Sequence, residues 1–218
     1  KLYSLVYGKA VSYNIDPIEK KPFFNFHPGT TAFSFSTVGC NFSCLHCQNW
    51  EISQASPEDY AGIDLPPKEI VEMGLKAKCG GIAYTYTEPT IFFEYGYDTM
   101  KLAKKKGLYN VYVTNGYMEK EPIDKMKGLL DAANVDVKGN EEFYRKVCGG
   151  AELEYVLENI KHMHKNGVHV EVAYLVIPGM NDKDDDFVEI ADWVVGVDRK
   201  MPLHFTRFYP QYKMMDTP

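Results

Sequence analysis

The chain of 218 residues carries a formal net charge of −6, and 45% of its residues are hydrophobic. This length can bury one sizeable core, and the ordinary apolar content indicates neither disorder nor a membrane class. The negative charge argues against a general nucleic-acid binder, which would show a basic excess. No apolar run approaches the ~20 residues that span a bilayer, and no signal-peptide pattern opens the chain. We therefore expect a cytoplasmic protein with no membrane partner.

The ends of the sequence are unusual. The chain starts with Lys1 rather than Met and stops at Pro218 without an obvious terminal element. We expect a piece of a longer protein. Residues 1–30 contain a turn-rich link at 16–22 and the aromatic run 23–26. We interpret them as a leading segment packed on a core domain that spans 31–218.

From residue 31 onward, helix-like stretches alternate with short β-branched or aromatic runs, and several of the helices end in glycine, a helix C-cap signal. The predicted strands cover residues 33–38, 82–86, 108–114, 134–137, 168–177 and 203–208. The predicted helices between them cover 68–78, 91–106, 122–133, 152–166 and 182–197. Strands that alternate with helices predict an α/β protein with a parallel sheet, either open or closed into a barrel.

Residues able to do chemistry follow the predicted strands directly. They are Cys40, Glu88, Asn115, Lys138 and the segment 178–182. Because the carboxyl ends of parallel strands meet at one edge, this alignment predicts an active site there.

Three of the five cysteines, Cys40, Cys44 and Cys47, have the spacing Cys-x3-Cys-x2-Cys. Disulfide frameworks belong mostly to small secreted domains with even numbers of cysteines, so clustered thiols here favour metal binding. Thiolate is the preferred ligand of iron–sulfur clusters. A [4Fe–4S] cube needs four ligands, so either Cys79 or Cys148 supplies the fourth or one iron stays open.

A zinc site is the alternative interpretation of this loop. It would recruit His46 or another thiol to complete a closed tetrahedral site. Only one of the paired Cys-x2-Cys knuckles typical of such sites is present. Cys79 and Cys148 are most simply buried small hydrophobic residues.

The Cys-x3-Cys-x2-Cys loop directly after a first strand resembles the radical S-adenosylmethionine (SAM) superfamily. In Tyr86-Thr87-Glu88-Pro89, Glu88 matches the acid of that superfamily's Gly-Gly-Glu-Pro turn, although Tyr86 and Thr87 replace the glycines. The resemblance implies a partial (βα)6 TIM-like barrel and a [4Fe–4S] cluster whose open iron binds SAM. It also implies an external reductant of flavodoxin or ferredoxin type, reductive cleavage of SAM, and hydrogen abstraction by a 5′-deoxyadenosyl radical.

A narrower resemblance covers nearly the whole chain. Segments 16–22, 28–29, 39–42, 47–50, 84–89 and 204–210 resemble the radical SAM enzymes of the AmmeMemoRadiSam system, which are homologues of the pyruvate formate-lyase activating enzyme. This resemblance implies an oxidoreductase that acts on a protein glycyl residue or on another substrate or partner of that system. A non-enzymatic iron–sulfur or zinc protein for electron transfer or scaffolding is the competing function.

The resemblance also implies the site residues. Beside the three metal-ligating cysteines, it places these residues at the cofactor: His46, Gln48, Thr87, Glu88, Thr114, Asn115, Asp136, Lys138 and His204. Arg207 is a candidate for binding an anionic substrate.

Each of these assignments has a plainer alternative. Glu88 could simply cap the helix that starts near Thr90, and Asn115 could belong to an Asn-Gly turn. The Asp136 and Lys138 side chains share one strand face and could form a solvated pair. His204 could be buried and satisfied, and Arg207 could lie on the surface.

Overall fold

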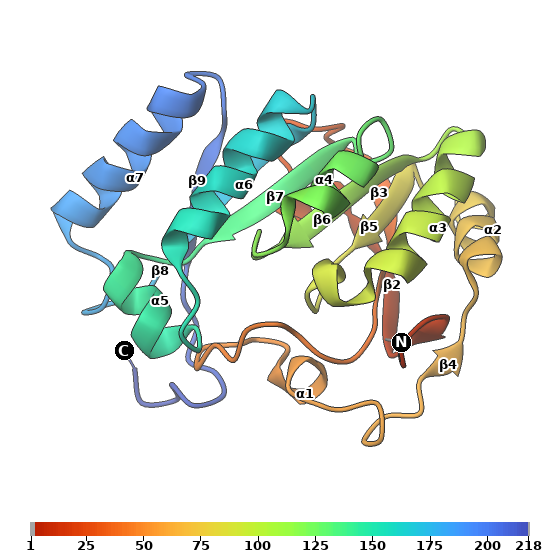
Figure 1. The fold of residues 1–218 in the computed structure, drawn as a ribbon, viewed down its shortest axis with the longest axis horizontal. Coiled ribbons are helices and arrows are strands. Elements are labelled where there is room, and N and C mark those ends of the chain that lie inside the picture. The colour runs from red at the N-terminus through yellow and green to blue at the C-terminus, as the bar shows by residue number, and fades with distance from the viewer. Residues whose placement is uncertain (1–2, 218) are drawn as a thin grey trace.

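In the computed structural model, which describes residues 3–217, seven strands form one sheet in the order β2-β3-β5-β6-β7-β8-β9 (Figure 1). Their bounds are β2 Ser12–Pro17, β3 Thr31–Ser36, β5 Gly81–Tyr84, β6 Tyr109–Thr114, β7 Ala132–Val137, β8 His169–Val176 and β9 Leu203–Arg207. The strands from β3 to β9 pair in parallel, and only β2 pairs antiparallel, with β3. The α/β class and the six parallel strands are therefore confirmed.

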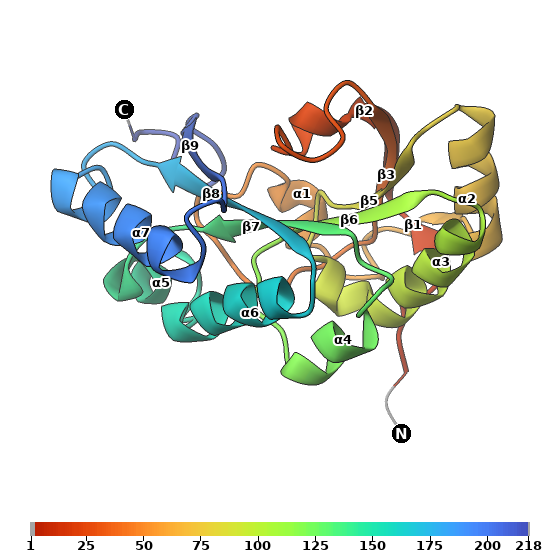
Figure 2. The same ribbon diagram turned by 90° about the horizontal axis from the view of Figure 1, so that it is seen from above.

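The long helices lie on one side of the sheet, whereas β2 and the turn after it lie on the other (Figure 2). The helices are α2 Pro67–Lys76, α3 Phe93–Lys105, α4 Lys120–Lys125, α5 Glu141–Val147, α6 Leu153–Lys165 and α7 Asp184–Val197. The smaller elements are β1 Lys9–Ala10 paired with β4 Ile63–Asp64, α1 Trp50–Ser53, and the 3-10 turns η1 Ile18–Lys20 and η2 Pro89–Phe92. Helices on one face of a curved parallel sheet form a partial TIM-like barrel.

The sheet separates two apolar regions. The larger one lies between the sheet and the helices and contains fully buried aromatic side chains such as Phe35, Tyr84 and Tyr112. The smaller one lies on the opposite face of the sheet, because side chains alternate along each strand. There the fully buried Phe23 of the leading segment packs with small residues of the strands, Ala32, Ala83, Val111 and Ala132.

A buried carboxylate attaches the leading segment to the inner face of the sheet, which is the face opposite the long helices. Glu171 on β8 accepts hydrogen bonds from the backbone N–H groups of Phe24 and Asn25, at 3.3 and 3.0 Å. Its two oxygens also lie 3.0 Å from His169 Nε2 and 2.6 Å from His204 Nε2. Burial alone would raise the pKa of Glu171, but these donors hold it below its ordinary value. The segment therefore crosses the inner face of the sheet from β2 to β8 and β9.

The predicted helix 122–133 is wrong in its second half. The helix α4 ends at Lys125, and residues 132 and 133 already belong to β7. Gly128 between them adopts a φ of +76°, which is incompatible with continuing the helix. The predicted helix 91–106 is divided into η2 and α3, and the short α1 and α5 were not predicted.

Within residues 3–217, the helices are too short or too polar to cross a bilayer.

Phe23 tests whether the leading segment is an integral part of this core. The Phe23→Ala variant should lose about 3–5 kcal/mol of unfolding free energy, because it empties a fully buried site. The Phe24→Ala variant is the control, since Phe24 is 54% exposed and should cost about 0.5 kcal/mol or less. Urea unfolding measures both. Equal losses in the two variants would mean that residues 23–26 do not pack as described.

Candidate functional site

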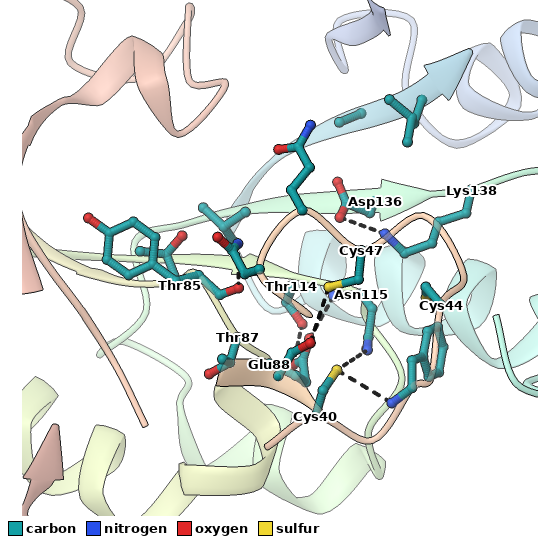
Figure 3. Close-up of a pocket in the computed structure, with 18 of the residues that line it drawn as sticks. Cys40, Cys44, Cys47, Thr85, Thr87, Glu88, Thr114, Asn115, Asp136 and Lys138 are labelled. Atoms are coloured by element: carbon teal, nitrogen blue, oxygen red, sulfur yellow. Dashed lines mark hydrogen bonds and ion pairs between the residues drawn. The ribbon is translucent and has the colours of Figure 1, made fainter. Parts of the chain in front are cut away.

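The carboxyl ends of the parallel strands surround a cavity of about 570 Å³ (Figure 3). The strand ends, the cysteine loop and the leading segment all contribute to its wall. Among the residues predicted to form the site, the following line it: Cys40, Cys44, His46, Cys47, Gln48, Thr87, Glu88, Thr114, Asn115, Asp136, Lys138 and Arg207. The structure thus brings together residues that are up to 167 positions apart, from Cys40 to Arg207.

His204 is the predicted site residue that does not line this cavity. It lies in the amino-terminal half of β9, where its imidazole pairs with Glu171 and its ring centroid is 5.2 Å from that of Phe24. In the structure it connects β9 to β8 and to the leading segment. Its predicted role in cofactor binding stays a prediction.

Backbone hydrogen bonds hold the cysteine loop against two other parts of the chain. Leu45 N donates to Val147 O at the end of α5, at 2.9 Å, and Leu45 O accepts from Lys213 N at 3.1 Å. Gly149 comes so close to Ser43 that a Cβ atom at this position would clash with the serine. The loop is therefore positioned by packing as well as by its own sequence.

The three thiols of the loop lie in different surroundings. Cys40 Sγ accepts from Phe42 N at 3.4 Å, and Cys47 Sγ lies 3.1 Å from Ser53 Oγ. Cys44 is buried and hydrogen-bonded to the buried Cys148, which does not line the cavity. Burial and the Glu88 carboxylate raise the pKa of Cys40 to about 12. The free thiol is therefore protonated at neutral pH, and metal binding must release its proton.

Glu88 joins the ends of two strands. Its side chain accepts from Thr90 N at 3.0 Å and from Thr90 Oγ1 at 2.6 Å, so the predicted capping role is real. The same carboxylate accepts from Thr114 Oγ1 at 2.7 Å and from Asn115 N at 2.8 Å, across the gap from β5 to β6. Burial raises its pKa, while these hydrogen bonds oppose the rise. Glu88 is thus both a cap and a fixed acceptor in the cavity wall.

Polar side chains from β6 and β7 complete this half of the cavity. Asn115 Nδ2 donates to Asn41 Oδ1 at 2.7 Å and lies 4.0 Å from Cys40 Sγ. Lys138 Nζ lies 2.9 Å from Asp136 Oδ2, so the two residues form a pair that lines the cavity. Burial opposes the charge of Lys138, but Asp136 and the nearby thiols hold its pKa above the ordinary value.

The opposite half of the wall contains residues that the sequence interpretation missed. Lys20, Lys21 and Pro22 of the leading segment line the cavity together with Tyr86, the residue two positions before Glu88. Tyr86 has a φ of +65°, which a non-glycine residue rarely adopts. A glycine at this position in the resembling motif was the only signal in the sequence that the backbone here is unusual.

The donors present suit an iron–sulfur cluster better than a single ion. Among the described residues, no group of three Cys, His, Asp or Glu side chains converges as the ligands of one metal ion do. A cluster binds its thiolates at separate irons, so they need not converge on one point. In addition, the Nδ1 atom of His46 is buried without a hydrogen-bond partner, as expected for a wall that receives a polar ligand.

Comparison with known proteins identifies the family. The model of the radical SAM superfamily matches residues 34–194. The chain belongs to the radical SAM superfamily. Proteins of this superfamily bind a [4Fe–4S] cluster and SAM, and the three cysteines and the cavity beside them fit these two groups. The predicted fold and cofactors are therefore confirmed.

Two relatives and one solved structure illustrate the similarity. An uncharacterized protein of Methanocaldococcus jannaschii is 50% identical over all 218 residues, which span 65% of its length. The pyruvate formate-lyase 1-activating enzyme of Escherichia coli is 28% identical over 171 residues, which cover 76% of this chain and 69% of the length of that enzyme. The structure of native anSMEcpe with bound AdoMet has a TM-score of 0.63 at 20% identity, covering 81% of this chain and 50% of that one. The chain thus spans about two thirds of the relatives it matches.

Gly149 and Gly150 test the packing of the cysteine loop. Both have φ near +87°, so alanine at either position should cost about 1–2 kcal/mol of backbone strain. Only Gly149→Ala adds a clash with Ser43, whereas the site of a Cβ at Gly150 is open. After anaerobic reconstitution, Gly149→Ala should bind less iron per chain than Gly150→Ala. Equal iron contents would contradict the role of this contact.

Proposed function

We propose that this chain is the catalytic core of an enzyme that cleaves SAM reductively and uses the 5′-deoxyadenosyl radical to abstract a hydrogen atom from a substrate. The observation that carries the proposal is the juxtaposition of three thiols and a buried acid in one cavity, with no fourth cysteine in its wall. The group bound there supplies one-electron chemistry when an external flavodoxin- or ferredoxin-type reductant delivers the electron. The protein's own residues bind, orient and enclose the reactants.

The geometry supports a ligand at the open iron. Cys148 contacts Cys44 but does not line the cavity, and Cys79 lies on the turn between α2 and β5. Neither of them is thus placed to complete a four-thiol site on the cavity side. An iron with an open position needs a ligand that brings its own donor atoms.

The strand ends offer partners for the methionine part of SAM. Glu88 Oε2 accepts one hydrogen bond from the protein, from Asn115 N, and an ionised carboxylate oxygen can accept another. An ammonium group would bind there through a charge-assisted hydrogen bond. Lys138 brings positive charge for a carboxylate, and the neutral His46 offers a flat ring for the adenine. Burial and the charge of Lys138 lower the pKa of His46 to about 3, which keeps the ring uncharged.

Two finer assignments belong to the same proposal. The similarity to activating enzymes favours an oxidoreductase that generates a glycyl radical on a partner protein. A substrate or partner from the AmmeMemoRadiSam system is the other candidate. The competing interpretation, an iron–sulfur or zinc protein for electron transfer or scaffolding, predicts no affinity for SAM.

The three loop cysteines test the proposal. Anaerobic reconstitution of the full-length protein, followed by dithionite and SAM, should yield 5′-deoxyadenosine, measured by liquid chromatography. Alanine at Cys40, Cys44 or Cys47 should abolish the product and reduce the bound iron, because each supplies one cluster ligand. The Cys79→Ala variant is the control and should retain both. A reconstituted wild-type protein that forms no 5′-deoxyadenosine would sink the enzyme proposal.

Glu88 tests the cofactor's position. The Glu88→Gln variant keeps the shape of the side chain but removes its charge, so the affinity for SAM should fall roughly tenfold or more. The Glu94→Gln variant, on the exposed side of α3, is the control and should bind SAM like the wild type. Equilibrium dialysis of the reconstituted proteins measures both. Unchanged affinity in Glu88→Gln would restrict Glu88 to its structural role.

A further inference from the structure

We infer that the cavity holds a second subsite, formed by Lys21 and Arg207 with Lys20 at its edge, that binds the carboxylate or phosphate group of a small-molecule substrate. This inference names the substrate class and therefore rests on the proposed function. It stands on three observations: the distribution of charge around the cavity, the fixed position of Lys21, and the apolar side chains in the rest of the wall.

The charged residues that line the cavity differ in net charge from one element to another. Glu88, Asp136 and Lys138, at the ends of β5 and β7, carry one negative charge together, before the thiolates are counted. Lys20 and Lys21 from the leading segment and Arg207 at the end of β9 carry three positive charges. The carboxylate paired with the two lysines is Asp16, which leaves two positive charges in excess. A cationic wall is unexpected in a chain with a net charge of −6.

Lys21 is held rigidly although it is almost fully buried. Its side chain is 4% exposed, its Nζ lies 2.7 Å from Asp16 Oδ2, and the ammonium lies 4.1 Å from the centre of the Tyr86 ring. Asp16 is occupied on both oxygens, because Lys20 binds Oδ1 at 2.9 Å and the Tyr86 hydroxyl donates to Oδ2 at 2.5 Å. An ammonium group has three donors. Asp16 and the ring face together engage two of them, so a donor of Lys21 is available to a ligand in the cavity.

Stability of the fold does not explain a lysine at this position. Burying an ammonium costs free energy that its pairing often fails to recover, and apolar replacements of buried ion pairs are often neutral or stabilising. Burial also lowers the pKa of Lys21, against the pull of Asp16. An anion beside Lys21 would favour its charged form and would balance the positive charge that remains because Lys20 and Lys21 share one carboxylate, Asp16.

The remaining wall suits the body of a small molecule. Pro22, Val113, Ala173 and Leu175 line the cavity and contribute apolar surface. The leading segment also reaches β9, since the Phe24 ring lies 5.2 Å from that of His204, three residues before Arg207. Lys21 and Arg207 both line the same cavity. A small anionic substrate would balance the positive charge that Asp16 leaves in excess in this wall, whereas a neutral glycyl segment of a protein would not.

Tyr86 connects this subsite to the cofactor side. Its hydroxyl binds Asp16, and its backbone carbonyl accepts from Asn49 Nδ2, two residues after the last cysteine of the loop, at 2.8 Å. The carbonyl and the ring of one strained residue thus face two different parts of the site. An anion held at Lys21 is in this way placed at a defined position relative to the cluster loop.

The experiment uses the reconstituted full-length protein with SAM bound, so that the cofactor region is already filled. Inorganic phosphate and acetate are titrated separately by calorimetry at constant ionic strength, with chloride as the reference anion. The wild type should bind at least one of the two oxyanions in preference to chloride, and the stronger binder identifies the substrate's group. The Lys21→Met variant should weaken that affinity roughly tenfold or more, because a buried charged hydrogen bond is lost.

Matched variants separate the subsite from general charge effects. Lys104→Met is the control, since Lys104 also pairs with an aspartate, Asp131, but does not line the cavity. It should bind the oxyanion like the wild type. Arg207→Gln, at an exposed position, should weaken binding and does not depend on the folding of a buried variant. The dissociation constant of SAM should change less than about twofold in Lys21→Met.

Four outcomes would overturn the inference. The first is that the wild type binds neither oxyanion in preference to chloride, and the second is that Lys104→Met loses as much oxyanion affinity as Lys21→Met. The third is that Lys21→Met loses as much affinity for SAM as for the oxyanion. The fourth is binding of a glycine-containing peptide that neither phosphate nor the Lys21→Met change affects. The last outcome would assign the cavity to a protein substrate. Oxyanion binding that depends on Lys21 in a protein that forms no 5′-deoxyadenosine would refute the proposed function while retaining the anion subsite.

Discussion

The parallel pairing of the strands from β3 to β9 is the constraint on which the site depends. It brings the carboxyl ends of six strands to one edge, so residues separated by much of the chain meet around a single cavity. Glu88 illustrates the consequence, because its carboxylate at the end of β5 binds Thr114 and Asn115 at the end of β6. A shift of one strand by a single residue would turn these side chains to the opposite face and disperse the site.

The leading segment covers the inner face of the sheet and forms one wall of the cavity. A partial barrel of six strands leaves its inner face open, and residues 18–27 cross that face. Phe23 fills the amino-terminal half, Glu171 fixes the backbone at Phe24 and Asn25, and Lys20 and Lys21 reach the cavity above them. One segment therefore closes the lower part of the barrel and furnishes one wall of the site.

Much of this arrangement could be predicted from the sequence alone. Alternating helices and strands admit few topologies, and glycine after a helix marks its end, so β6 at Tyr109–Thr114 was predicted as 108–114. The prediction of 122–133 is wrong because it continues through Gly128, which is such a signal, into the residues that begin β7. Short elements such as α5 depend on a single cap, where the Asn140 side chain accepts from Phe143 N, and give too little periodicity to detect.

Much of the candidate site was predictable because its residues end a strand or follow one. Cys40, Glu88, Asn115 and Lys138 follow a strand, Thr114 and Asp136 lie near the end of one, and all of them line the cavity. His204 was assigned by resemblance alone, and it pairs with Glu171 below the cavity. That pairing depends on which face of β9 meets β8, a question of register that local pattern does not answer.

The burial of Lys21 could not be predicted from the sequence. Its neighbours in the sequence, 16–22, predict a turn-rich link, in which a lysine gives no sign of a role. Its burial depends on the antiparallel pairing of β2 with β3, on the left-handed backbone of Tyr86, and on a carboxylate that Lys20 and Tyr86 also bind. None of these is a local property. A buried charged group that three parts of the fold hold in a cavity wall is the kind of residue for which a ligand is the most economical physical explanation.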